Sequence, residues 1–500
     1  MGDSHLLTIG EDDKAILVWR HEVDDMAFEE PDFEEDAEID LNTELNFFVP
    51  KAQRNISAKA YSRPWLSSIV EPTIKAPLST SSPPSRRLEL VHIHGYQSKS
   101  NNNDLVYNCQ GEIIFASSSI CIIYDRDNHS QRYFRKHNAQ ISCFAISPSR
   151  RMIASADFSR CCKLKVWDAQ TCHEISTLDD GYHKKGIIYL AFAADSKRIV
   201  TVGAEDNQII CVWYSLSAEW DDGAFEASAI CLNENETVLF AEFIEQEQSP
   251  YVIATGGVNH MKFWSINSID LIPSLAIYES IGSKQHMTCG TSCWNKFVTG
   301  TESSELYIWA GRSLTKVISK KIVQGTITSI HFCKIGLVTG CDDGCVRIWS
   351  DKFHQTKSLQ ISALDCSIKS IDSCLDSSQK SIITLLIGTN SSEIFEVATE
   401  SGNIKQLHES HYSGEIWGLA MHPILDDVYC TCADDCTIRI WSYASKSLSK
   451  RIDTEKSLRA ITWSNDGKHL IVGCGDGDCD KEEKTSEEDG TVRYHSKYDK

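Results

Sequence analysis

Several features common in other proteins are missing from this sequence, and each absence excludes a class of function. No stretch holds the roughly 18 consecutive apolar residues that a membrane-spanning helix requires. The N-terminal residues MGDSHLLTIGEDDK lack the basic and apolar regions of a secretory signal. We therefore expect a cytoplasmic protein without a membrane partner.

Positive charge is scarce, because the chain has 49 basic and 70 acidic residues and a formal charge of -21. Nucleic-acid binders need a cationic stripe along the phosphates, so we expect no nucleic-acid partner. Residues 22–40 carry eleven carboxylates and no Lys or Arg. This composition predicts a solvated linker. The alternative is an acidic docking peptide that inserts Met26, Phe28 and Phe33 into a partner.

Catalytic motifs are also missing. The sequence has no Gly-rich phosphate loop, no nucleophile elbow and no HExxH helix. We predict that the protein is not an enzyme, with no catalytic residues, no cofactor and no cofactor-binding residues.

The 20 cysteines are scattered through strand-like segments and form no compact disulfide framework. The closest approach to a metal constellation is Cys430, Cys432 and Cys436, which lacks the paired spacing of a zinc site. We expect small buried hydrophobic side chains in a reducing cytosol and no metal site.

What the sequence does contain is a repeat, in which a short β-branched run ends in an aromatic residue. The clearest copies read KLKVWD, IICVW, CVRIW and TIRIW, and successive endings are 40 to 51 residues apart. The endings are Tyr124, Trp167, Trp213, Trp264, Trp309, Trp349, Phe395 and Trp441. This period is typical of a four-stranded propeller blade, which buries its faces only against neighbouring blades.

Each repeat also holds a nearly continuous apolar run, such as ISCFAISP, IIYLAFAAD, ITSIHF or IWGLAMHP. Such runs are typical of strands covered on both faces. The pattern predicts an all-β fold, a β-propeller whose inner strands are these runs.

The run LELVHIHGYQSKSNNNDLVYNCQGEIIFASSSICIIYD resembles the HELP motif of the echinoderm microtubule-associated protein-like (EMAP-like) family. RYFRKHNAQISCFAISPSRRMIAS looks like the first WD repeat after that motif, and HESHYSGEIWGLAMHP resembles a later repeat. The resemblance covers residues 88–500. It implies WD-repeat propellers in tandem, the second of them incomplete, in a fragment of a longer protein.

The expected organisation has five parts. Residues 1–21 resemble the closing hairpin of a preceding unit, and residues 22–87 form an acidic and then Pro/Ser-rich linker. The HELP-like motif spans residues 88–125 and lies within a first propeller of about seven blades at residues 88–405. Residues 406–500 begin a second propeller.

WD repeats hold their blades together with a buried network that joins a histidine, a turn carboxylate and the tryptophan through a strand hydroxyl. The residues that match this pattern are His137, Asp157, Trp167, Asp343, Trp349, His411, Asp435 and Trp441. Asn207, Val258 and Ser303 replace the turn carboxylate in three blades, which we expect to depend on apolar packing.

Two functions fit this reading. The resemblance implies a cytoskeletal protein that binds tubulin or microtubules, and other proteins, through its propeller faces and helps to organise microtubules, including at the spindle, cilium or axoneme. The alternative is a generic WD-repeat scaffold, of the ciliary-transport or ubiquitin-ligase type, without tubulin contact. Because the microtubule surface is acidic, binding needs a local basic patch, for which Arg150, Arg151, Lys184 and Lys185 are candidates.

Overall fold

The computed structural model describes most of the chain outside the N-terminal region. The described residues are 5–9, 15–23, 86–98, 104–160, 162–179, 181–231, 236–244, 252–319, 325–361, 366–375, 383–475 and 492–494. They contain strands and turns but no helix, and so no helix that could cross a membrane. The chain forms two compact units, one of residues 1–20 with 90–500 and the other of residues 21–89.

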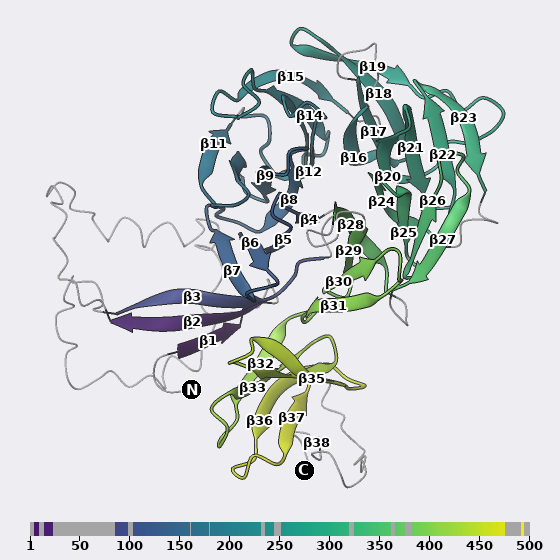
Figure 1. Ribbon diagram of the computed structural model, residues 1–500. Coiled ribbons are helices and arrows are strands. Elements are labelled where there is room, and N and C mark those ends of the chain that lie inside the picture. Colours follow the sequence, from purple (N-terminus) through teal and green to yellow (C-terminus); the bar gives the residue numbers. More distant parts are fainter. Residues whose placement is uncertain are drawn as a thin grey trace, which may run out of the picture. The chain divides into compact units, whose positions relative to one another are not determined.

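Most of the first unit is a ring of seven four-stranded blades (Figure 1), and the four strands of each blade are consecutive in the chain. Blades 1 to 3 are β4(Leu105–Tyr107), β5(Ile113–Ser117), β6(Ile120–Asp125), β7(Ser130–Phe134); β8(Ile141–Ile146), β9(Met152–Asp157), β10(Leu164–Asp168), β11(Glu174–Leu178); and β12(Ile187–Phe192), β13(Arg198–Gly203), β14(Ile209–Tyr214), β15(Ala224–Ile230). Blades 4 and 5 are β16(Thr237–Ile244), β17(Val252–Val258), β18(His260–Asn267), β19(Asp270–Leu275); and β20(Met287–Cys293), β21(Lys296–Thr301), β22(Leu306–Ala310), β23(Ser313–Ile318). Blades 6 and 7 are β24(Ile327–Cys333), β25(Gly336–Cys341), β26(Cys345–Trp349), β27(Gln355–Gln360); and β28(Ile368–Leu375), β29(Ile383–Thr389), β30(Glu393–Ala398), β31(Ile404–Glu409).

The first strand of each blade is the inner one. Strand β8 packs on β12, and the series continues through β16, β20 and β24 to β28, which packs on β4 and closes the ring. The apolar runs that the sequence marked as inner strands therefore lie between blades. The prediction of an all-β propeller is confirmed.

A β-bulge recurs at the same place in most blades, next to the aromatic residue that ends the third strand. The register between the third and fourth strands shifts at Trp167, Trp213 and Trp309, and again at Trp349, Phe395 and Trp441. A bulge increases the local twist of a strand. We infer that the repeated bulge contributes to the twist that each blade needs.

Glycine in the second strand lets the inner strand of the next blade approach closely. A Cβ atom on Gly340 would lie 2.5 Å from Ile368 Cγ2, and one on Gly300 would lie 2.6 Å from Ile327 Cγ2. These distances are shorter than any ordinary carbon contact, so packing excludes a side chain at both positions.

Replacing Gly340 with alanine is therefore expected to lower the free energy of unfolding by about 1–3 kcal/mol, the usual cost of overpacking a core. The measurement is the urea midpoint by tryptophan fluorescence. Gly473→Ala is the matched control, because its added Cβ would lie 3.5 Å from Ala460 Cβ, an ordinary contact. Equal midpoints for the two variants would contradict this account of blade packing.

The rest of the first unit is a second group of sheets. It comprises a sheet of β1(His5–Ile9), β2(Ile16–Val23) and β3(Arg86–His94), an eighth blade of β32(Ile416–Met421), β33(Val428–Ala433), β34(Thr437–Ser442) and β35(Ser447–Asp453), and a sheet of β36(Leu458–Trp463), β37(Leu470–Cys474) and β38(Val492–Tyr494). Ile16 of β2 shares a core cluster with Ile416, Tyr429 and Trp441 of the eighth blade. The N-terminal hairpin thus packs on the eighth blade of its own chain. Its assignment to a preceding unit stays a prediction.

The observed strand ends differ from the expected domain limits. The first ring begins at β4, because residues 88–94 lie in β3 beside β2, and its last strand β31 continues past residue 405 to Glu409. The 88–125 run therefore connects two sheets, one on each side of residues 99–103. Most of the predicted linker 22–87 lies outside the described residues.

Candidate functional site

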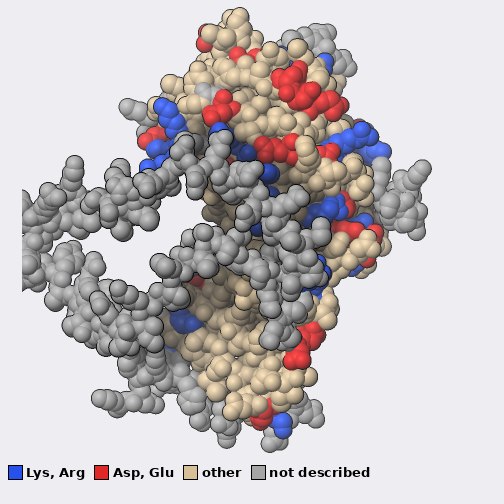
Figure 2. Space-filling view, turned by 90° about the vertical axis from the view of Figure 1, so that its left-hand side faces the viewer, with Lys and Arg blue, Asp and Glu red and all other residues tan. Residues whose placement is uncertain are grey.

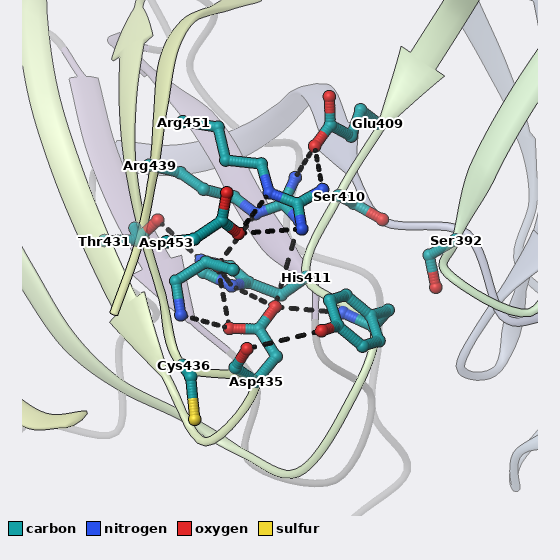
Figure 3. Close-up of polar contacts among 12 residues, drawn as sticks. Ser392, Glu409, Ser410, His411, Thr431, Asp435, Cys436, Arg439, Arg451 and Asp453 are labelled. Atoms are coloured by element: carbon teal, nitrogen blue, oxygen red, sulfur yellow. Dashed lines mark hydrogen bonds and ion pairs between the residues drawn. The ribbon is translucent and has the colours of Figure 1, made fainter. Parts of the chain in front are cut away.

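The polar network of the eighth blade links four side chains, two from strands β33 and β34 and two from the connecting segments beside them (Figure 3). The indole N–H of Trp441 donates to Thr431 Oγ1 at 2.9 Å, and Thr431 lies 2.9 Å from His411 Nε2. His411 Nδ1 lies 2.9 Å from Asp435 Oδ2. With Nδ1–H donating to the carboxylate, Nε2 accepts from the threonine hydroxyl, and every group in the series has a partner.

Two arginines, Arg439 and Arg451, lie beside this network (Figure 3). Arg439, which is fully buried, lies 3.8 Å from Asp435 and 3.1 Å from Glu409, and Arg451 Nη1 lies 2.9 Å from the same Glu409 oxygen. Burial alone would raise the pKa of Asp435, but the hydrogen bond from His411 and the nearby charges hold it below its usual value. Burial lowers the pKa of His411. The network therefore contains a neutral His411 imidazole beside an ionised Asp435 carboxylate.

The structure brings the other predicted network residues together only in part. His137 lies 3.2 Å from Asp157 and 2.7 Å from Ser155, whose hydroxyl accepts the Trp167 indole N–H at 3.0 Å. Trp349 instead donates to Thr339 at 3.0 Å, and Asp343 is paired with Arg347, not with a histidine.

The expectation that blades without the turn carboxylate depend on apolar packing is wrong for two of them. In blade 3, His183 lies 2.9 Å from Thr201, which accepts the Trp213 indole N–H at 3.1 Å, and Glu205 is 3.8 Å away. In blade 4, the corresponding series is Glu236, His260, Thr255 and Trp264. The carboxylates sit at other sequence positions, so the spacing to tryptophan did not reveal them.

Arg150, which the sequence suggested as a partner contact, forms an ion pair where the first ring closes. Its two terminal nitrogens donate to the two carboxylate oxygens of Asp372 in blade 7 at 2.6 and 2.7 Å, and one of them also donates to the Tyr107 carbonyl in blade 1 at 2.8 Å. The Tyr107 backbone N–H donates to Asp372 at 2.7 Å. Since Arg150 belongs to blade 2, one ion pair connects three blades.

A cavity of about 300 Å³ lies beside this ion pair, among the inner strands. Tyr189 Oη donates to Glu242 Oε1 at 2.5 Å, and burial raises the pKa of Glu242 to about 7. His331, 3.8 Å from Asp372, has its pKa lowered by burial. None of the residues that line the cavity forms a nucleophile–base pair in the described part of the chain.

A second cavity, of about 230 Å³, is lined by four histidines that the sequence did not single out, His92, His94, His129 and His408. Strands β6, β7 and β31 of the first ring, strand β3 and the eighth blade contribute to its wall. His129 is paired through Tyr124 Oη at 2.7 Å and the Lys446 carbonyl at 3.2 Å. One ring nitrogen of each of the other three histidines is buried without a hydrogen-bond partner. We call this group the junction histidines.

The other predicted contact residues are exposed. Lys185 Nζ lies 2.7 Å from Asp206, and the backbone N–H groups of Lys184 and Lys185 donate to Glu205, whereas no ion pair of Arg151 occurs among the described residues. On the face shown in Figure 2, basic and acidic side chains lie in small separate groups, without a continuous basic stripe. Whether any of these residues contacts a partner stays a prediction.

The cysteines of the described chain are free thiols. Cys430 and Cys432 are buried in one apolar cluster with Leu458 and Val472. Within the described residues, no three His, Cys, Asp or Glu side chains are arranged to hold a metal ion.

Blades of four consecutive strands, most of them with a tryptophan indole that donates to a strand hydroxyl, define a WD-repeat β-propeller protein. Residues 402–442 match the model of the WD domain, G-beta repeat. Residues 130–397, more than half of the chain, match the model of the echinoderm microtubule-associated protein first beta-propeller. The chain belongs to this family.

Curated relatives carry the same family name. The chain is 22% identical to echinoderm microtubule-associated protein-like 1 of Homo sapiens, over 72% of this chain and 43% of the relative. It is 24% identical to echinoderm microtubule-associated protein-like 2 of Homo sapiens, over 78% and 60%, and 21% identical to the 77 kDa echinoderm microtubule-associated protein of Lytechinus variegatus, over 79% and 58%. The chain thus spans about half the length of the curated relatives it matches.

Proposed function

We propose that this chain is a non-catalytic cytoskeletal protein that binds microtubules or soluble tubulin through its propeller faces and contributes to microtubule organisation in the cytoplasm. The observation that carries the proposal is the family match over residues 130–397, which covers most of the first ring. The relatives are named as microtubule-associated proteins.

The structure supports a binding role for physical reasons. Apolar packing between inner strands and the Arg150–Asp372 ion pair join blades of the first ring, and buried polar networks such as that of His137 hold single blades together. The result is a rigid ring with many turns on its two faces. Turns on a rigid scaffold are the usual place for binding residues. The proposed contacts are therefore turns of the propeller, with spindle or ciliary arrays as the expected sites of action.

The charge of the chain limits how such binding works. At -21 the protein is repelled on average by an acidic surface, although salt screens this repulsion beyond a Debye length of about 8 Å at physiological ionic strength. Binding must then use local positive charge, and it should weaken as salt rises.

Co-pelleting with taxol-stabilised microtubules is the direct test, with the full chain and a series of salt concentrations. We expect the chain to pellet with microtubules at low salt and to pellet less, in a graded way, as salt increases. A pulldown with soluble tubulin, run in parallel, separates binding to polymer from binding to the subunit.

A negative result in both assays would contradict the proposal. If an unrelated complex then co-purified with the chain, the generic scaffold would be the better account. The variant Asp453→Asn serves as a folded control in both assays, because the carboxylate that it removes is exposed and is paired only at the surface of the eighth blade.

A further inference from the structure

An open pocket of about 530 Å³ lies on one rim of the first ring, between the turns of blades 5 and 6. Trp294 of the β20–β21 turn forms one wall, and Phe332 at the end of β24 forms another. Their rings are 5.0 Å apart and meet edge to face. Phe332 is 37% exposed, so the pocket presents aromatic surface to solvent.

The backbone under this pocket is held in a conformation that disfavours large side chains. Trp294 and Asn295 have φ angles of 46° and 57° and connect the paired residues Cys293 and Lys296 as a two-residue hairpin turn. Such turns favour Asn and Gly, because both central residues need positive φ. A tryptophan there costs stability, and strained residues of this kind cluster at ligand-binding sites.

A third aromatic ring fixes the position of Trp294. Phe353, in the β26–β27 turn, is 5% exposed and lies edge-on to Trp294 at 5.5 Å. Its φ is also positive, at 59°. The pocket is thus a built aromatic surface whose floor is packed before any ligand arrives.

Lysines surround these rings. Lys334 lines the pocket, and the Nζ atoms of Lys296 and Lys316 each lie 5.7 Å from the centre of the Phe353 ring. All three side chains are exposed, and none forms an ion pair with a carboxylate among the residues that the structure describes. One carboxylate, Asp351, lines the pocket. A chain with a charge of -21 therefore has a local excess of positive charge here.

We propose that this lysine-rimmed aromatic pocket docks an acidic, glutamate-rich segment of tubulin, with an apolar or aromatic side chain of that segment seated against Trp294 and Phe332. The inference rests on the proposed function and names its contact surface. Aromatic anchors supply most of the binding energy at protein interfaces, and complementary charge speeds encounter and sets orientation. This pocket offers both in one place.

The first test uses a short fluorescein-labelled peptide of glutamates with one central tyrosine, and measures its affinity for the full chain by fluorescence anisotropy. The double variant Lys296→Glu with Lys334→Glu is expected to weaken binding by about tenfold or more. The matched control is Lys136→Glu with Lys405→Glu, which changes the total charge equally at exposed lysines near blades 2 and 7. Equal losses in the two double variants would overturn the proposal.

Trp294→Gly separates binding from folding. Glycine accepts positive φ without strain, which offsets part of the packing that Trp294 makes with Phe332 and Phe353, so this variant is expected to stay folded while it loses peptide affinity by about tenfold. Unchanged affinity in Trp294→Gly would overturn the role of the aromatic anchor. A peptide with glutamine in place of glutamate is expected to bind at least tenfold more weakly.

Microtubule co-pelleting with the same variants distinguishes this inference from the proposed function. If the wild-type chain pellets and Lys296→Glu with Lys334→Glu pellets equally, the pocket is not the contact, and the proposed function stands. If the wild-type chain neither pellets with microtubules nor captures soluble tubulin, tubulin is not the source of the acidic segment. If deletion of residues 22–40 raises peptide affinity, the chain's own acidic stretch is the occupant, which also overturns the assignment to tubulin.

Discussion

Lowering the pH from 7.5 to 5 is expected to reduce the free energy of unfolding by several kcal/mol, before the ion-paired carboxylates are protonated. The reason is burial of neutral histidine. Burial lowers the pKa values of His92 and His94, and nearby histidines and Lys446 lower them further. His408 behaves in the same way, with a pKa of about 4.

The sign follows from proton binding in the two states. An unfolded histidine has a pKa of about 6.5, so between pH 6.5 and the lower folded pKa the unfolded chain binds more protons. Stability is therefore intact above pH 6.5 and is lost as pH falls toward 4. At about 1.36 kcal/mol per pH unit, His408 alone accounts for roughly 2 kcal/mol at pH 5. His260, His331 and His411 have pKa values lowered by burial and add to the loss.

Glu242 and Glu393, whose pKa values are raised by burial, act in the opposite direction. Because the pKa of Glu242 is raised to about 7, the folded chain binds the proton first, and this term gains stability as pH falls through 7. The paired carboxylates Asp157, Asp372 and Asp435 have lowered pKa values, so their contributions disappear only below about pH 4. They lie outside the pH window of the test.

The measurement is the urea midpoint at several pH values between 7.5 and 5, for the wild-type chain and for His408→Gln. Glutamine cannot be protonated, so the variant should show a shallower fall of stability with pH, by about 2 kcal/mol at pH 5. Glu242→Gln is the second comparison and should show a steeper fall. Parallel pH profiles for the wild type and His408→Gln would contradict the assignment.

Asp435→Ala is expected to destabilise the eighth blade by about 3–5 kcal/mol, the usual cost of removing one partner from a buried ion pair. The Asp435 carboxylate is fully buried, and its loss leaves the Nδ1–H of His411 without its acceptor and Arg439 with one counter-charge fewer. The hydrogen bonds that the carboxylate accepts from the hydroxyl and backbone N–H of Thr437 would also disappear.

Asp453→Asn is the matched control on the same blade. Its carboxylate is 69% exposed and pairs with Arg451, so its removal should cost less than about 1 kcal/mol. Urea denaturation gives the free energies, and hydrogen exchange of the β33 and β34 amides localises the effect. Equal losses in the two variants would show that the buried network does not hold this blade together.

The sequence was most informative where partners are close along the chain. Trp441 and Thr431 are ten residues apart, and His411 precedes Asp435 by 24, so one repeat contains the whole network. The spacing of the aromatic endings predicts the four-stranded blade for the same reason. Its regularity comes from a local unit that packs identically many times.

Contacts between distant repeats left no comparable signal. Arg150 and Asp372 are 222 residues apart, and nothing in either segment marks the other as its partner. The junction histidines come from segments up to 316 residues apart, since His92 and His408 are both among them, and these segments meet because the ring closes and β3 lies beside it. Glu236 precedes the first strand of its blade. The sequence pattern expects the carboxylate at a fixed distance before the tryptophan, so it did not predict Glu236.

The consecutive order of strands within every blade of the first ring has a consequence for synthesis. Each blade from β4 to β31 is complete once its own segment has left the ribosome, and no strand must wait for a partner from the opposite end of the ring. The packing of β4 on β28 and β29, and the contacts of Tyr107 and Arg150 with Asp372, require the last blade. The ring can therefore assemble in translation order. Side-chain contacts join its last blade to its first, and no strand is exchanged between the two blades.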